Sequence, residues 1–217
     1  MHVQYGCGLS APQKWVNFDV SPTLRLQNFP LLGIVLRPLL NVQFPNNVKY
    51  GDIIKGLPVK ENSVDGIYCS HTLEHLALDD LRIALKNTHK VMKSGAIFRM
   101  VLPDLEFIAR KYIENLDLGE PSSSHVFLDN SMLGIKSRSR GFLSFLRSYY
   151  GNSHHLWMWD FLSLSKELDN LGFENIRRCN YGDSKDEMFK DVEDIDRFHN
   201  CLSLECVKSD FKISTYG

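Results

Sequence analysis

The fold is decided by residues 63–103, which read SVDGIYCSHTLEHLALDDLRIALKNTHKVMKSGAIFRMVLP. An apolar strand is followed by a His-rich turn, a polar helix, a Lys-Ser-Gly turn and a second apolar strand. Parallel neighbouring strands need a crossover of about a dozen residues or more, so this unit predicts a parallel sheet. Ligands of such sheets bind beyond the carboxyl ends of the strands, so chemistry is expected at Cys69, Ser70 and His71.

Further elements are predicted on both sides of this unit. Other strands are expected at His2–Tyr5, Trp15–Val20, Val48–Ile54, Ile176–Tyr181 and Leu202–Val207. Two helices are expected, one from the Asp104 cap to about Leu116 and one over Leu156–Leu171, which ends at a glycine. The alternating charges of residues 183–200 predict a solvated helix or loop.

The first strand ends in a glycine-rich turn, Gly6-Cys7-Gly8-Leu9-Ser10-Ala11, which satisfies the G-x-G-x-x-G/A pattern of dinucleotide-binding proteins. That class needs a helix directly after the glycines and an acidic residue about 20 positions further on. Here Pro12 and Trp15 leave no room for the helix, and Asp19 follows Gly8 by only eleven positions. The spacing argues against a pyrophosphate site and predicts that the first crossover helix is shortened or absent.

Composition limits the class of protein further. The 217 residues are 43% hydrophobic, which suffices for one domain spanning residues 1–217. The net charge of −1 argues against nucleic acid as a partner. No apolar run reaches about 18 residues and no leader pattern is present, so no membrane span is expected. Five cysteines without a CxxC pair indicate reduced thiols and a cytoplasmic location.

Residues 3–104 resemble class I S-adenosylmethionine-dependent methyltransferases. The fourth strand of that family opens with an acidic residue and ends near a Leu-Glu-His turn, and this chain has Asp65 and Leu73-Glu74-His75 there. A Val-Leu-Lys-Pro-Gly-Gly turn follows in the family, and residues 91–96 read Val-Met-Lys-Ser-Gly-Ala, with Ser94 and Ala96 in place of the Pro and the second Gly. More narrowly, the Gly-Cys-Gly opening is similar to that of a group of small predicted methyltransferases. No acidic residue precedes the glycines, so one polar contact that the family often uses is missing.

The resemblance implies an α/β fold of the Rossmann-like methyltransferase type. Its sheet is doubly wound, mostly parallel and of the seven-stranded type, with one antiparallel edge strand. The resemblance also implies S-adenosylmethionine as the cofactor. This molecule carries no phosphate, so close backbone approach at Gly6, Cys7 and Gly8 suffices to bind it without a helix dipole.

The same resemblance assigns roles to side chains at the strand tips. Asp19 would accept hydrogen bonds from the ribose hydroxyls, which suits a carboxylate. Asp52 would accept a hydrogen bond from the adenine amino group, while Ile53 packs on the ring. Ser70 and His71 complete the predicted cofactor-binding set, and His71 contacts the methionine part of the cofactor or acts as a catalytic base.

The string from His71 to His75 has other interpretations. It matches the H-x-x-E-H arrangement of inverted zinc peptidases, but those enzymes carry it within a helix, whereas here it straddles a strand end. A metal-dependent RNA methyltransferase that modifies small-RNA ends has a related Glu-x-x-Glu-His turn, with His71 in place of the first Glu. We favour the interpretation in which no metal binds and Glu74 and His75 orient the loop.

A second His-rich string covers residues 154–160 and reads HHLWMWD. His155 is the other candidate catalytic base, because an imidazole accepts a proton near neutral pH. Core packing of the aromatic residues is the alternative. Residues 117–155 form an insertion that is predicted to be a lid over the site. Its basic side chains Lys136, Arg138 and Arg140 are candidates for binding an acidic group of the acceptor, or are simply solvated.

The predicted function is methyl transfer from S-adenosylmethionine to an oxygen or nitrogen nucleophile of a small-molecule acceptor. Two alternatives stay open. One is a metal-dependent hydrolase that uses His71, Glu74 and His75. The other is a non-catalytic, methyltransferase-like binding protein.

Overall fold

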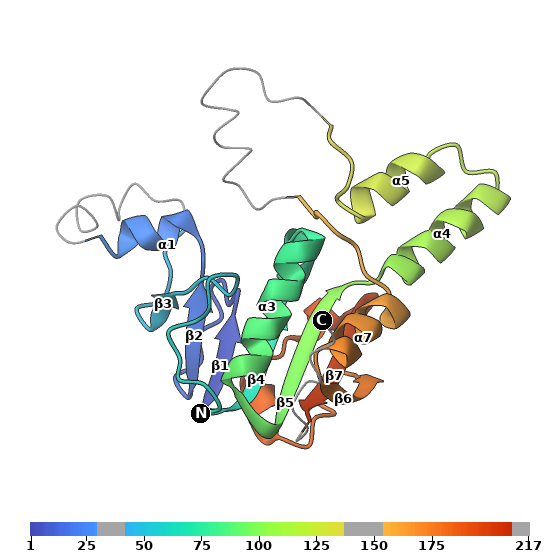
Figure 1. Ribbon diagram of the computed structural model, residues 1–217. Helices are drawn as coiled ribbons and strands as arrows, with labels where there is room; N and C mark the ends of the chain where they lie inside the picture. Colours follow the sequence, from blue (N-terminus) through green and yellow to red (C-terminus); the bar gives the residue numbers. More distant parts are fainter. Residues whose placement is uncertain (30–41, 137–153, 210–217) are drawn as a thin grey trace.

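The computed structural model describes residues 1–29, 42–136 and 154–209, and its centre is a seven-stranded sheet in the order β3-β2-β1-β4-β5-β7-β6 (Figure 1). The strands are β1 (His2–Tyr5), β2 (Trp15–Asp19), β3 (Val48–Tyr50), β4 (Val64–Ser70), β5 (Met92–Pro103), β6 (Phe173–Arg178) and β7 (Cys201–Lys208). Strands β1 to β5 pair in parallel, and β7 pairs antiparallel to both β5 and β6. The predicted Rossmann-like methyltransferase fold is confirmed, and the reversed strand lies one position in from the edge.

Strand β5 is longer than the sequence indicated. It begins at Met92 rather than Ile97. Residues 93–95, where a turn was expected, belong to the strand but interrupt its regular pairing with β4. Val64 of β4 pairs with Met92, whereas Gly66 pairs with Ile97, so the additional residues of β5 bulge out of the ladder. Gly95 has a φ of 75°, a left-handed conformation that glycine adopts without strain.

The connection between β1 and β2 contains no helix, as its spacing predicted. Buried amide side chains hold it instead. Gln4 donates from Nε2 to Asn17 Oδ1 at 2.6 Å and to the Ser10 carbonyl at 2.7 Å. Asn17 donates from Nδ2 to the Pro12 carbonyl at 3.1 Å. These bonds satisfy backbone carbonyl groups of the connection, which in a crossover helix would accept hydrogen bonds from backbone amides.

One face of the sheet is covered by α3 (Leu78–Val91) and α7 (Phe161–Asn170). Leu81 and Leu85 of α3 and Leu164 and Leu168 of α7 are fully buried in one cluster with the sheet. Helix α7 begins five residues later than predicted, because the Asp160 side chain accepts a hydrogen bond from the backbone of the third helical residue and forms a capping box. Residues 156–160 are therefore extended rather than helical.

The remaining helices are short or lie at the ends of the sheet. They are α1 (Pro22–Gln27), η2 (Leu73–His75), α4 (Leu105–Asp117), α5 (Ser123–Asn130), η3 (Glu187–Asp191) and α8 (Ile195–Phe198). Asp104 caps α4 as predicted, by accepting from the Glu106 and Phe107 amides. Helices α4 and α5 extend away from the sheet (Figure 1). Within the described ranges, no helix combines the length and the apolar character needed to cross a bilayer.

The opposite face is covered by the segment between β6 and β7, which was predicted to be solvated. That prediction holds for most of the segment but not for Phe189, Val192 and Glu193, which are buried. Phe189 and Val192 of this segment pack with Trp15, Tyr68 and Val101 of the sheet. The segment thus covers sheet surface beside the connection that has no helix.

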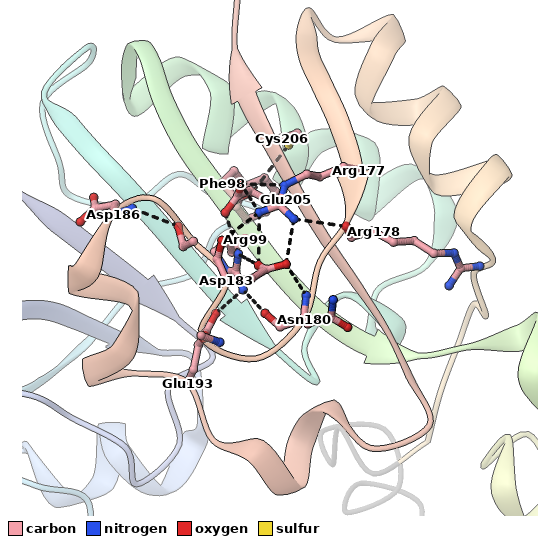
Figure 2. A network of polar contacts seen from close by, with 12 residues as sticks. Phe98, Arg99, Arg177, Arg178, Asn180, Asp183, Asp186, Glu193, Glu205 and Cys206 are labelled. Carbon is pink, nitrogen blue, oxygen red and sulfur yellow. Dashed lines mark hydrogen bonds and ion pairs between the residues drawn. The ribbon is translucent and has the colours of Figure 1, made fainter.

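Arg99 of β5 holds two acidic residues of this segment, Asp183 and Glu193, against the sheet (Figure 2). Its side chain is 1% exposed, and its guanidinium lies 2.6 Å from both Glu193 and Glu205 and 2.9 Å from Asp183. It also donates to the Asn180 carbonyl at 2.9 Å. A buried guanidinium needs such partners, so the acidic segment is drawn onto the sheet.

Candidate functional site

The tips of β1, β2, β3 and β4 line one crevice of about 970 Å³ at the carboxyl ends of the strands. The crevice contains seven of the eight residues predicted to bind the cofactor, namely Gly6, Gly8, Asp19, Asp52, Ile53, Ser70 and His71. Residues up to 65 positions apart in the sequence therefore share one wall, because parallel strands end at the same edge. A volume of this size suits a ligand as large as a nucleoside with a side chain.

The glycine turn brings the backbone close to the crevice. Gly6 and Gly8 have φ values of 62° and 55°, which only glycine adopts readily. A Cβ atom at Gly6 would overlap the side chain of Thr72. Cys7, by contrast, is not among the residues that line the crevice. Its side chain is buried beside Leu24, and burial, assisted by Asp19, raises the pKa of the Cys7 thiol to about 12.

The two carboxylates at the tips of β2 and β3 are oriented by backbone amides. Asp19 accepts from the Gly8 amide at 2.9 Å and from the Ser21 amide at 2.8 Å, one on each oxygen. Asp52 accepts from the Ile54 amide at 3.0 Å. A carboxylate has about four acceptor positions, so each retains capacity for a ligand in the crevice.

His71 is held in a left-handed conformation, with a φ of 50°, directly after β4. Its Nδ1 lies 3.3 Å from Glu74 Oε1, and its Nε2 lies 3.4 Å from the carbonyl oxygen of Arg197. Burial alone would lower the pKa of His71, but contacts with Cys201 and Glu74 outweigh it and raise the pKa to about 10. The ring is therefore protonated at neutral pH and faces the crevice as a cation, so it is poorly suited to be a base.

Arg197 is a crevice residue that sequence reasoning missed. It lies on α8, and its guanidinium is 3.5 Å from the Ser70 hydroxyl. The sequence signal that could have located Arg197 is Arg99, a lone charge within an apolar strand. A buried Arg99 requires acidic partners, and the segment between β6 and β7 that supplies two of them also carries Arg197. Arg197 adds a positive charge at the tip of β4.

His155 is not among the residues that line the crevice, although the structure places it directly behind. Its Nε2 lies 4.0 Å from Glu74 Oε1, and its Nδ1 is hydrogen-bonded to the Ser131 carbonyl at 2.8 Å. Burial lowers the pKa of His155, although Glu74 partly opposes the shift. The ring is also 5.0 Å from that of His75. His155 thus belongs with Glu74 and His75 rather than with the crevice wall.

The predicted lid is described only in part. Residues 137–153, which include Arg138 and Arg140, lie outside the described residues. Of the basic run, Lys136 is described, and it pairs with Asp129 at 2.9 Å. Leu156, just after the predicted lid, lines the crevice.

The known proteins to which this chain is similar are described as methyltransferases. A family model described as "Methyltransferase domain" matches residues 33–100, which is less than half of the chain. A comparison with curated proteins found no match. A solved Thermotoga maritima structure is described as a SAM-dependent methyltransferase, possible histamine N-methyltransferase. It has a TM-score of 0.50 at 19% identity, over 96% of this chain and 81% of that one.

Two further solved structures are similar. A SAM-dependent methyltransferase from Archaeoglobus fulgidus has a TM-score of 0.48 at 15% identity, over 95% of this chain and 85% of that one. Phosphoethanolamine N-methyltransferase 2 of Haemonchus contortus, in complex with S-adenosyl-L-methionine, has a TM-score of 0.48 at 10% identity, over 96% of this chain and 48% of that one. The family match and the shared fold support a class I methyltransferase.

Proposed function

We propose that this protein is an S-adenosylmethionine-dependent methyltransferase that acts on an oxygen or nitrogen nucleophile of a small molecule. The observation that carries the proposal is the convergence of four strand tips, with Gly8, Asp19, Asp52 and Ser70, on one crevice. The family match at residues 33–100 supports it. When bound, the cofactor would supply a methyl group on a sulfonium centre, and in-line attack of the nucleophile on the methyl carbon would release the neutral thioether.

The residues of the crevice fit this cofactor. The free acceptor positions of Asp19 suit the two ribose hydroxyls, and those of Asp52 suit the adenine amino group. Ile53 provides an apolar side chain for the ring. Arg197, beside Ser70, is our candidate for binding the carboxylate of the methionine part.

The chain's own contribution to the reaction is positioning and exclusion of water. A sulfonium loses its charge as the methyl group moves, so a dry and ordered site matters more than strong countercharges. We propose that the insertion at residues 117–155 closes over the tip of β4 and orients the acceptor. Its sequence favours no single acceptor.

Binding measurements test the proposal. Calorimetry with S-adenosylmethionine and S-adenosylhomocysteine is expected to show one site per chain, and Asp19→Ala is expected to weaken binding at least about tenfold, because two charge-assisted hydrogen bonds are lost. The matched control is Asp79→Ala, since the Asp79 side chain is 90% exposed on α3. If the wild-type protein binds neither nucleoside, the proposal is wrong.

Activity separates the alternatives. Transfer of a labelled methyl group from the cofactor to a component of cell extract would establish an enzyme. Cofactor binding without transfer to any component would indicate a non-catalytic binding protein. The hydrolase alternative lacks its required geometry, because residues 73–75 form a 3₁₀ turn after a strand rather than part of an α-helix.

A further inference from the structure

A buried carboxylate that lacks a hydrogen bond lies behind the crevice. The Glu74 side chain is 1% exposed, and neither of its oxygens has a hydrogen-bond partner among the described residues. His71 lies 3.3 Å from one oxygen, but outside hydrogen-bonding geometry. Burial of a carboxylate is strongly unfavourable unless the group is paired or binds a metal ion. The contact with His71 leaves the other acceptor positions of Glu74 for a further ligand.

Two imidazoles near Glu74, those of His75 and His155, each keep one ring nitrogen free. Nδ1 of His75 lies 3.0 Å from the carbonyl oxygen of His154, and Nδ1 of His155 lies 2.8 Å from that of Ser131. A carbonyl oxygen only accepts, so each Nδ1 carries the hydrogen and each Nε2 has the lone pair in the neutral ring. Backbone carbonyls hold the histidine ligands of metal ions in this manner.

We propose that Glu74, His75 and His155 bind one divalent transition-metal ion. One ligand atom from each residue lies within 4.8 Å of the other two. In a tetrahedral zinc site with bonds of about 2.1 Å, ligand atoms are about 3.4 Å apart, so side-chain shifts of about 1 Å close the site. Two imidazoles and one carboxylate suit zinc, whereas Mg²⁺ and Ca²⁺ prefer oxygen ligands.

The backbone already holds these three ligands together. The amides of Leu156 and Trp157 donate to the carbonyl of Glu74 at 2.8 and 3.3 Å. These bonds fix the segment that carries His155 against η2, which carries the other two ligands. Because the ligands are ordered before the metal arrives, little conformational entropy is lost on binding.

The site also opens toward the crevice. His75 is itself a crevice residue, as are His71 and Leu156, so the proposed metal site borders the space where an acceptor would bind. A metal ion there would polarise an acceptor oxygen and lower the pKa of its hydroxyl, a use that rests on the proposed function. Metal binding itself does not depend on that function.

The test is a metal titration of the full chain, freed of any histidine tag and stripped with a chelator. Zn²⁺ is expected to bind at one ion per chain by calorimetry, and Co²⁺ is expected to give visible absorption bands of a four- or five-coordinate site. Glu74→Gln and His155→Ala are expected to weaken Zn²⁺ binding at least about tenfold, since each removes one of three ligands. His154→Ala is the matched control, because it removes the neighbouring imidazole and keeps the carbonyl that holds His75.

A readout on the wild-type protein covers the case in which a variant fails to fold. The Co²⁺ form is expected to show two strongly shifted imidazole N–H proton signals, one from Nδ1 of each histidine ligand. Absence of bound metal, no shifted N–H signal, or equal Zn²⁺ affinity of folded His155→Ala and wild type would overturn the proposal. S-adenosylhomocysteine binding, measured on the same samples, reports separately on the proposed function.

Discussion

Replacement of Arg99 by Met would remove the cation that contacts buried Glu193 under the β6–β7 segment, whereas Asp183 and Glu205 would keep Arg177 as a partner. Arg99 contacts Glu193 and Glu205 at 2.6 Å and Asp183 at 2.9 Å, and its side chain is 1% exposed. Removal of one partner from a buried ion pair costs about 3–5 kcal/mol. For a chain of this size, about 2–4 °C of Tm is lost per kcal/mol, so Arg99→Met is expected to lower Tm by roughly 6–20 °C.

The assay is thermal denaturation followed by circular dichroism, with two comparison variants. Arg99→Lys keeps the charge but not the planar fork, so an intermediate Tm is expected. Arg82→Met is the matched control. Arg82 makes a similar two-point contact with Glu167, at 3.0 and 2.8 Å, but on the surface, where solvent screens it. Little change in Tm is expected there.

The same variant connects stability to the site. The β6–β7 segment carries Arg197 into the crevice, so Arg99→Met is also expected to weaken cofactor binding. The reasoning is refuted if Arg99→Met lowers Tm no more than Arg82→Met does. It is also refuted if the Tm falls as expected while cofactor affinity stays at the wild-type value.

Three more predictions follow from the geometry. Gly6→Ala is expected to lower both Tm and cofactor affinity, because its Cβ would overlap Thr72; calorimetry that shows wild-type affinity contradicts this. Arg197→Met is expected to weaken binding of S-adenosylhomocysteine but not of 5′-methylthioadenosine, which lacks the carboxylate; equal losses for both ligands contradict the assignment. Although burial opposes it, Arg177 holds the pKa of Asp183 well below its usual range. The stabilisation is fully present above about pH 5 and is lost as the pH falls toward the lowered pKa, so the Tm difference between wild type and Asp183→Asn is expected to shrink from about pH 5 to about pH 2, and a constant difference contradicts it.

The order of the elements could be read from the sequence because the signals for it are local. Alternation of apolar residues and the punctuation by glycine located β1 with its observed bounds, and located β4 with its end near Ser70. The spacing from Gly8 to Asp19 predicted a connection without a helix, and the structure has none there. The residues at the carboxyl ends of β1 to β4 line one crevice because parallel strands end at the same edge of the sheet.

Tertiary structure alone decided what lies beside those tips. Arg197 is 127 positions from Ser70, and His155 is 81 positions from Glu74, so no periodicity or motif connects them. The charges of residues 183–200 indicated solvent exposure, which most of these residues have, whereas Asp183 and Glu193 pair with the buried Arg99. Local patterns encode the conformation of the backbone, but the partner of a buried charge is set by which distant segments the folded chain brings into contact.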